Sequence, residues 1–151
     1  MRNRGSFVAL CLLAAACADT QTPATQVMVA ITSDLRPETE LSRIEITVSD
    51  RKGLNQSWME SLTLVAKNPR GGQHTLPVTL PVRKGTQDSF LIVVKGYGPV
   101  GIGGSEEQIV EQRAVATFQT GKALLLKIFL GRICLREFCG GKGEAVCYAS
   151  T

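Results

Sequence analysis

Apolar and polar residues alternate in short stretches from residue 27 to residue 130 of the chain. In the clearest case Ile44, Ile46 and Val48 alternate with polar or charged neighbours, which would bury one face of a strand and leave the other in water. Similar stretches predict strands at 27–31, 58–66, 76–82, 90–97, 113–118 and 122–130. Because glycine, proline and polar residues separate these stretches, the pattern predicts an all-β domain. We expect an antiparallel immunoglobulin- or transthyretin-like β-sandwich of about seven strands.

For two of these stretches the sequence also predicts a position within the sheet. Pro77 and Pro81 remove backbone donors from 76–82, so this stretch belongs at a sheet edge. The stretch 90–97 is the most apolar one in the interior of the chain and should lie centrally. One segment, 105–112, could form a short helix, because its first residues have the spacing of a capping box. The alternative is that it extends the strand that follows.

The last two stretches are predicted to pair with each other. Residues 113–118 and 122–130 would form a hairpin through the turn at 119–121. In the second of them Leu126 and Ile128 share a face and should belong to the core. The final strand would then close the sandwich.

The first residues of the chain have the features of a secretory signal. Arg2 and Arg4 precede an apolar stretch that ends in small alanines and Cys17. This stretch is too short for a membrane span, which needs about 20 apolar residues. Residues 14–17 (AAAC) resemble a bacterial lipobox, whose cysteine is lipidated and becomes the new N-terminus, although the first alanine replaces the usual leucine. Residues 16–18 also fit an ordinary cleavage site that would release a soluble protein.

These features divide the chain into four parts. We expect a signal peptide at 1–16, a lipid-anchored flexible tether at 17–26, the β-sandwich at 27–131 and a cysteine-containing tail at 132–151. Loss of the signal removes two arginines, so the net charge falls from +4 to +2. The remaining basic residues are scattered and few aromatic residues could stack on bases, which argues against a nucleic-acid partner. The expected location is the bacterial cell envelope, anchored in the outer membrane and facing either the periplasm or the surface.

Three cysteines lie close together in the tail: Cys134, Cys139 and Cys147. An exported chain meets an oxidising compartment, so we expect one disulfide, and the odd number leaves one thiol over. Both Cys134 with Cys147 and Cys139 with Cys147 remain open. The single histidine, His74, could complete a zinc site with them, but the cysteine spacing lacks the close pair usual in zinc modules. We therefore predict no metal and no cofactor.

Motifs that would indicate catalysis or cofactor binding are weak or missing. Residues 96–101 match G-x-G-x-x-G, but a dinucleotide site needs an acidic residue about 20 positions on, and none stands at 120–122. A mobile glycine loop at one end of the sandwich is the preferred interpretation. The sequence has no G-x-S-x-G or H-E-x-x-H motif, and the neighbouring Glu106 and Glu107 are expected on a solvated face. We therefore expect that the protein is not an enzyme.

Four segments of the chain carry a resemblance to known sequences: VMVAITSDL at 27–35, ELSRIEITV at 40–48, LPVTLPV at 76–82, and AVATFQTGKALLLKIFL at 114–130 before the cysteine tail. In these segments the chain resembles a group of uncharacterised lipoproteins of myxobacteria and related Gram-negative bacteria. The resemblance implies a sandwich-like domain with closely spaced cysteines at its end and assigns no chemistry. Members often have four tail cysteines, whereas this chain has three.

Two functional hypotheses follow. The favoured one is a non-enzymatic lipoprotein of the cell envelope, held to the membrane by its N-terminal lipid and binding an unknown protein or glycan. The alternative is an exported carbohydrate- or peptidoglycan-binding module accessory to an enzyme. For that alternative Trp58 and Tyr97 are the candidate ligand platform, because stacking on a sugar needs exposed aromatic rings. The competing interpretation is that both rings belong to ordinary packing.

Overall fold

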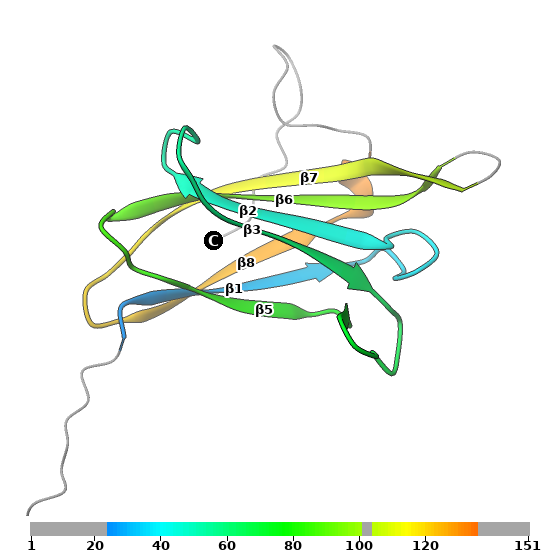
Figure 1. Cartoon of the computed structure of the whole chain (residues 1–151), viewed down its shortest axis with the longest axis horizontal. Coiled ribbons are helices and arrows are strands. Elements are labelled where there is room, and N and C mark those ends of the chain that lie inside the picture. Colours follow the sequence, from blue (N-terminus) through cyan, green and yellow to red (C-terminus); the bar gives the residue numbers. More distant parts are fainter. Residues whose placement is uncertain (1–23, 101–103, 136–151) are drawn as a thin grey trace, which may run out of the picture.

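The protein is a sandwich of two β-sheets, one with three strands and one with five (Figure 1). A computed structural model describes residues 24–100 and 104–135, and the structural statements below concern these residues. The strands are β1 (Gln26–Ser33), β2 (Arg43–Asp50), β3 (Gln56–Leu64), β4 (Gln73–His74), β5 (Val78–Arg83), β6 (Ser89–Val100), β7 (Ser105–Thr117) and β8 (Ala123–Leu130). A short 3₁₀ helix, η1 (Arg132–Cys134), follows β8. The predicted all-β sandwich is confirmed.

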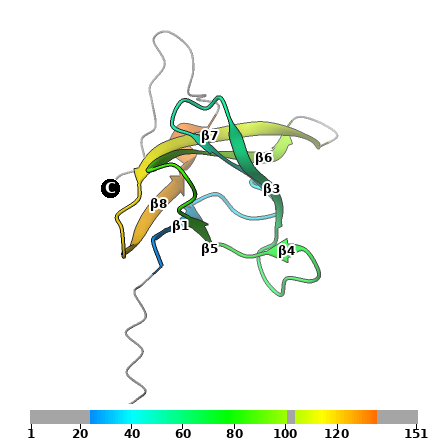
Figure 2. The same cartoon turned by 60° about the vertical axis from the view of Figure 1, so that its left-hand side comes forward.

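The two sheets differ in how their strands pair. In the three-stranded sheet β1 lies in the middle, antiparallel to β5 and parallel to β8. The five-stranded sheet has the order β4-β3-β2-β6-β7, and all its pairs are antiparallel except that of β3 with the short β4. Figure 2 shows β7 and β8 along one side of the sandwich, and β3 and β5 along the other.

The core fills the space between the two sheets. Alternate residues of β1, β2 and β6 point into it and are almost completely buried, as the alternating pattern predicts. Burying one aliphatic side chain of this kind contributes roughly 1.5–3 kcal/mol. The fully buried side chains with the largest volumes are Ile31, Leu41, Ile44, Ile46, Leu64, Ile92, Ile128 and Leu130.

Three predictions about strand position are confirmed. β5, which contains Pro81, forms an edge of the three-stranded sheet, whereas β6 is an interior strand paired on both sides. Ile128 is completely buried and Leu126 is partly buried against the core, so the predicted inward face of β8 is correct. β8 also contacts β7 across the sandwich.

The predicted helix at 105–112 is wrong, and the alternative of a longer strand is right. Residues from Ser105 onward belong to β7 and pair with the second half of β6, down to Val100 opposite Ser105. Pairing with β6 satisfies the backbone donors and acceptors that a capping box would otherwise satisfy. Tertiary pairing thus overrides the local helix signal.

The predicted hairpin between the last two strands is also wrong. β7 belongs to the five-stranded sheet and β8 to the three-stranded sheet, so the turn between them crosses from one layer to the other. Within the turn the N–H of Lys122 donates to the carbonyl of Gln119, and Gly121 has a φ of +69°. Hydrophobic alternation indicates which face of a strand is buried but not which sheet it joins. The fold is therefore not wholly antiparallel, because β8 pairs with β1 in parallel.

Two glycines of the G-x-G-x-x-G match, Gly96 and Gly98, do not lie in an end loop as predicted, because they are inside β6 and are buried. A Cβ at Gly96 would lie 2.6 Å from Val110 Cγ1 and 2.7 Å from Leu41 Cδ1. A Cβ at Gly98 would collide with the backbone carbonyl of Glu40. These glycines let the segment between β1 and β2 pack directly against β6. Gly101 lies outside the described residues.

Candidate functional site

A groove runs along the side of the sandwich between β3 and β5. Its larger part has a volume of about 450 Å³ and is lined by Val48, Ser57, Trp58, Glu60, Leu80, Pro81, Val82 and Arg83. A smaller hollow of about 190 Å³ lies toward the C-terminal end of β5 and shares Val48, Ser57, Val82 and Arg83 with the larger one. The two hollows therefore form one elongated groove, which we call the β3–β5 groove.

One face of β3 supplies both the core and the wall of this groove. Leu62 and Leu64 point into the core, and the preceding positions on the same face are Glu60 and Trp58, which line the groove. The strand register places Trp58 opposite the buried Val48 of β2. The groove is thus the continuation of the core at the side where β3 and β5 do not pair with each other.

The groove combines an aromatic surface with two charged groups of opposite sign. Trp58 is 36% exposed. Within the described residues the side chains of Glu60 and Arg83 form no ion pair and no hydrogen bond, so both remain available to a ligand. The hydroxyl of Ser57 is already engaged, because it donates to the carbonyl of Val48 at 3.0 Å. An apolar ring face, a carboxylate acceptor and a guanidinium donor can together hold a ligand with both apolar and polar faces, such as a sugar or an extended peptide.

The structure does not bring Trp58 and Tyr97 together. Tyr97 pairs with Arg43 of β2, whereas Trp58 pairs with Val48 of the same strand. Positions 43 and 48 are an odd number of residues apart, so the two rings lie on opposite faces of the five-stranded sheet. A single platform made of both rings is therefore not present, and only Trp58 lines the groove.

Tyr97 belongs to a polar assembly on the outer face of the five-stranded sheet. The guanidinium carbon of Arg43 lies 3.8 Å from the centre of the Tyr97 ring, a cation–π contact. Glu106 accepts hydrogen bonds from Ser42 Oγ at 2.6 Å and from Arg43 Nε at 2.9 Å. These bonds, that from Ser42 foremost, lower the pKa of Glu106. Glu106 and Glu107 are both exposed, as predicted, and Glu106 is in addition engaged in this assembly.

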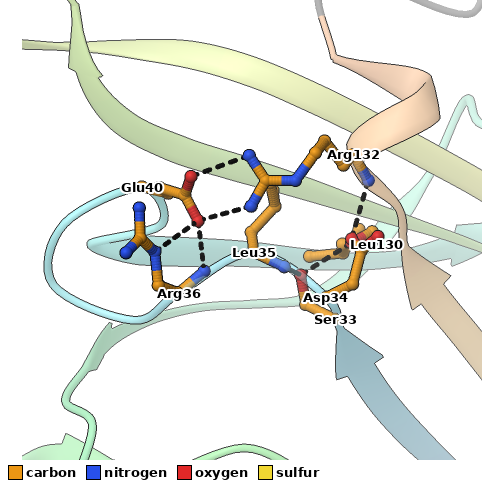
Figure 3. A network of polar contacts seen from close by, with 7 residues as sticks. All are labelled: Ser33, Asp34, Leu35, Arg36, Glu40, Leu130 and Arg132. Carbon is orange, nitrogen blue, oxygen red and sulfur yellow. Dashed lines mark hydrogen bonds and ion pairs between the residues drawn. The ribbon is translucent and has the colours of Figure 1, made fainter.

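A second polar cluster fastens the segment between β1 and β2 to η1 (Figure 3). Both terminal nitrogens of Arg132 donate to the carboxylate of Glu40, each at 2.7 Å. The backbone N–H of Arg36 donates to the same carboxylate at 2.8 Å, and the N–H of Arg132 donates to Asp34 at 2.7 Å. The hydrogen bonds from Arg132, with those from Arg36, hold the pKa of Glu40 well below its usual range. Since its groups bind each other, we interpret this Glu40–Arg132 clasp as structural.

The candidate cysteine and metal residues are only partly within the described chain. Cys134 lies in η1, is 5% exposed, and its Sγ accepts a hydrogen bond from Gln112 Nε2 at 3.5 Å. Cys17, Cys139 and Cys147 lie outside the described residues, so lipidation and the disulfide stay predictions.

The alternative of a zinc site that includes His74 does not fit the sheet. His74 lies on β4, at one edge of the five-stranded sheet, while Cys134 contacts β7 at the other edge. The two edges are separated by four strand spacings of about 4.8 Å, or roughly 19 Å. His74 and Cys134 therefore cannot share a metal ion. Among the residues that the structure describes, no group of three or more His, Cys, Asp or Glu residues is placed to hold a metal.

Sequence reasoning did not select Glu60 and Arg83. A signal for Glu60 was present, because it stands two residues after Trp58 and two before Leu62, on the face of the strand that the pattern assigns to the core. A carboxylate at such a position either protects a strand edge or contacts a ligand. Arg83 carried no comparable signal, since it ends its strand.

Comparisons with protein-family models, with curated proteins and with solved structures found no match to this chain. In the described part of the chain, no helix is long and apolar enough to cross a membrane. The function must therefore be argued from the groove and from the sequence features at the N-terminus.

Proposed function

We propose that this protein is a non-enzymatic lipoprotein of the bacterial cell envelope, anchored through Cys17 in the outer membrane, whose sandwich binds a ligand in the β3–β5 groove. The observation that carries the binding role is the groove itself, which joins an exposed indole to a carboxylate and a guanidinium that have no ion pair or hydrogen bond among the described residues. The support for the anchor is the AAAC sequence behind a short apolar stretch.

Mass spectrometry of the mature N-terminus tests the anchor. A diacylated or triacylated Cys17 is the expected result, and an unmodified chain that begins at Asp19 would reject lipidation. The Cys17→Ser variant should lose its acyl chains and leave the membrane pellet, because each buried CH₂ of a lipid contributes about 0.8 kcal/mol.

Binding in the groove is tested with the unlipidated protein and envelope fragments in a sedimentation assay at high salt, which suppresses charge attraction. Trp58→Ala and Glu60→Ala should each reduce the bound fraction. Met59→Ala is the matched control, because Met59 is the neighbour of both on β3, is 57% exposed and points to the other face of the sheet. Equal retention of all three variants would show that the groove is not the binding site.

The presence of Trp58 in the groove also favours a second candidate, a carbohydrate- or peptidoglycan-binding module. Trp58 is the only tryptophan of the chain, so its fluorescence reports on this groove alone. Purified peptidoglycan sacculi should then shift the Trp58 emission and sediment the protein. Binding to envelope fragments without binding to sacculi would instead indicate a protein ligand.

A further inference from the structure

The N-terminus leaves the domain between two basic turns. The N–H of Lys84 donates to the carbonyl of Thr25 at 3.1 Å, and the N–H of Gln26 donates to the carbonyl of Lys122 at 3.2 Å. In addition, the N–H of Gly121 donates to the hydroxyl of Thr25 at 2.9 Å. The start of β1 is thereby fixed beside Lys84 and Lys122.

The turn between β2 and β3 lies at the same end of the sandwich (Figure 1). The smaller hollow of the groove is lined by Asp50 before this turn, by Gly85 after β5 and by Phe118 after β7, so the three connections border one another. Arg51 and Lys52 are exposed in the β2–β3 turn, and Leu54 beside them is 77% exposed. We call this end of the molecule the basic end.

The basic end has an excess of positive charge. It carries Arg51, Lys52, Arg83, Lys84 and Lys122 against Asp50 and Asp88, a net charge of +3. Lys84 pairs with Asp88 at 2.6 Å, and Asp50 accepts hydrogen bonds from the N–H of Leu54 and the amide of Asn55. Within the described residues the other four cations have no ion pair.

The opposite end has no such excess. Five cations and five carboxylates lie there, a net charge of 0: Asp34, Arg36, Glu38, Glu40, Arg43, Lys67, Arg70, Glu106, Glu107 and Arg132. Several of them bind one another in the Glu40–Arg132 clasp. The described domain is therefore electrically polar, with its positive end where the N-terminus emerges.

The proposed lipid would hold this positive end close to a membrane. Seven residues, Cys17 to Pro23, separate the lipidated position from Ala24. Fully extended they span at most about 25 Å, and as a flexible coil about 15 Å. At that range the basic end lies within a few Debye lengths, of about 8 Å each, of the membrane surface.

We infer that the basic end docks on the anionic phospholipid headgroups of the membrane that holds the anchor, so that lipid and cations bind the same surface. This inference rests on the proposed anchor at Cys17. Each Lys or Arg close to an anionic membrane surface strengthens binding to it, so the basic end would orient a domain that the acyl chains already hold at the membrane. In this orientation the strands point away from the membrane surface, and the β3–β5 groove stays open at the side of the sandwich.

The test uses the chain from residue 17 onward with Cys17→Ser, so that no lipid contributes. Its sedimentation is measured with vesicles of phosphatidylcholine alone and with vesicles that also contain phosphatidylglycerol. We expect binding to the anionic vesicles only, and loss of this binding at high salt. The double substitution Arg51→Ser and Lys52→Ser should weaken it by about fivefold per residue, or about 25-fold.

The matched control is the double substitution Lys67→Ser and Arg70→Ser, which removes two exposed cations from the opposite end. This control should bind as the parent chain does, and thermal melts should show all variants folded. Equal binding to both kinds of vesicle, or equal weakening by both double substitutions, would overturn the inference. Whether Cys17 is lipidated is tested independently of these vesicle assays, because the mass of the mature N-terminus is measured on protein isolated from the cells that produce it.

Discussion

The two ends of the sandwich use their charged residues in opposite ways. At the end that carries η1, carboxylates and guanidinium groups bind each other, as Glu40 binds Arg132 through two bonds of 2.7 Å. At the basic end four cations have no ion pair within the described residues. The first arrangement ties segments of the chain together, and the second leaves charge facing outward. The same residue types thus serve structure at one end and, as we propose, membrane contact at the other.

This contrast shows that the positions of charged residues in the fold say more about function than the net charge does. The net charge of the whole chain is only +4, and Arg2 and Arg4, which contribute to it, lie outside the described residues. Its distribution over the folded domain nevertheless separates a positive end from a neutral one. Functional assignments based on net charge alone would miss this polarity.

The largest loss of stability is expected from Gly98→Ala, which disrupts packing at the end of the sandwich that carries the Glu40–Arg132 clasp. A Cβ at this position collides with the backbone of the segment that holds Glu40. Because backbone cannot swing aside like a flexible side chain, we expect a loss of about 3 kcal/mol in the free energy of unfolding, measured by denaturant titration. Gly85→Ala is the control at the basic end, where a Cβ would meet nothing within 4 Å. If Gly98→Ala changed the stability as little as the control does, the close packing of Gly98 against the Glu40 backbone would be contradicted.

A smaller loss is expected from Leu126→Ala, in the middle of β8 and between the two ends. Leu126 is partly buried against the core, so its truncation should cost about 2 kcal/mol, the low end of the range for leucine. Leu125→Ala should be nearly neutral, because Leu125 is 60% exposed on the other face. Vesicle binding of the folded Leu126→Ala protein should be unchanged. Equal losses for the two variants would mean that the face of β8 is assigned wrongly.

Glu40→Gln should have a smaller effect that depends on pH. Since the pKa of Glu40 is held below its ordinary value of 4.5 in the folded protein, its stabilising contribution is present above that pH and is lost as the pH falls below it. The melting temperature of the parent protein should therefore fall toward that of Glu40→Gln in acid. Glu107→Gln, at the same end but exposed, serves as the control and should follow the parent curve. Parallel curves for the parent and Glu40→Gln would show that the clasp contributes nothing.

The smallest effect on stability is expected for Arg51→Ser with Lys52→Ser at the basic end. Both side chains are exposed and form no ion pair within the described residues, so the free energy of unfolding should change by less than about 0.5 kcal/mol. Chemical denaturation measures this directly. A large loss would mean that these cations serve the fold, as Arg132 does at the other end, and would weaken the comparison.

Much of the fold could be predicted because each strand carries its own signal. Alternation identifies the buried face of β1, β2 and β8, and proline identifies β5 as an edge. The choice of partner strand could not be predicted in the same way. β8 pairs with β1 rather than with β7, although its alternation is compatible with either, because alternation specifies a face and not a neighbour.

Of the charged and aromatic residues that line the β3–β5 groove, only Trp58 was predicted from the sequence. Trp58 stood out by residue type, whereas its association with Tyr97 was wrong because the relative faces of two strands follow from their register. The register of β3 also turns Glu60 toward the groove, and the crossing of the chain to the other sheet brings Arg83 beside it. Positions of this kind are set by long-range pairing and have no local signature.

The pairing of β1 with β8 has a consequence for how such a chain matures. Ser33 and Leu130, which face each other in this pair, are 97 positions apart in the sequence. Under the export that we propose, with the N-terminus first, β1 crosses the membrane at the beginning of translocation and its partner β8 only near the end of the domain. Until Leu130 emerges, β1 lacks its parallel partner, and closing so long a loop is slow. During the proposed export, this topology would therefore delay closure of the sandwich until β8 has crossed the membrane.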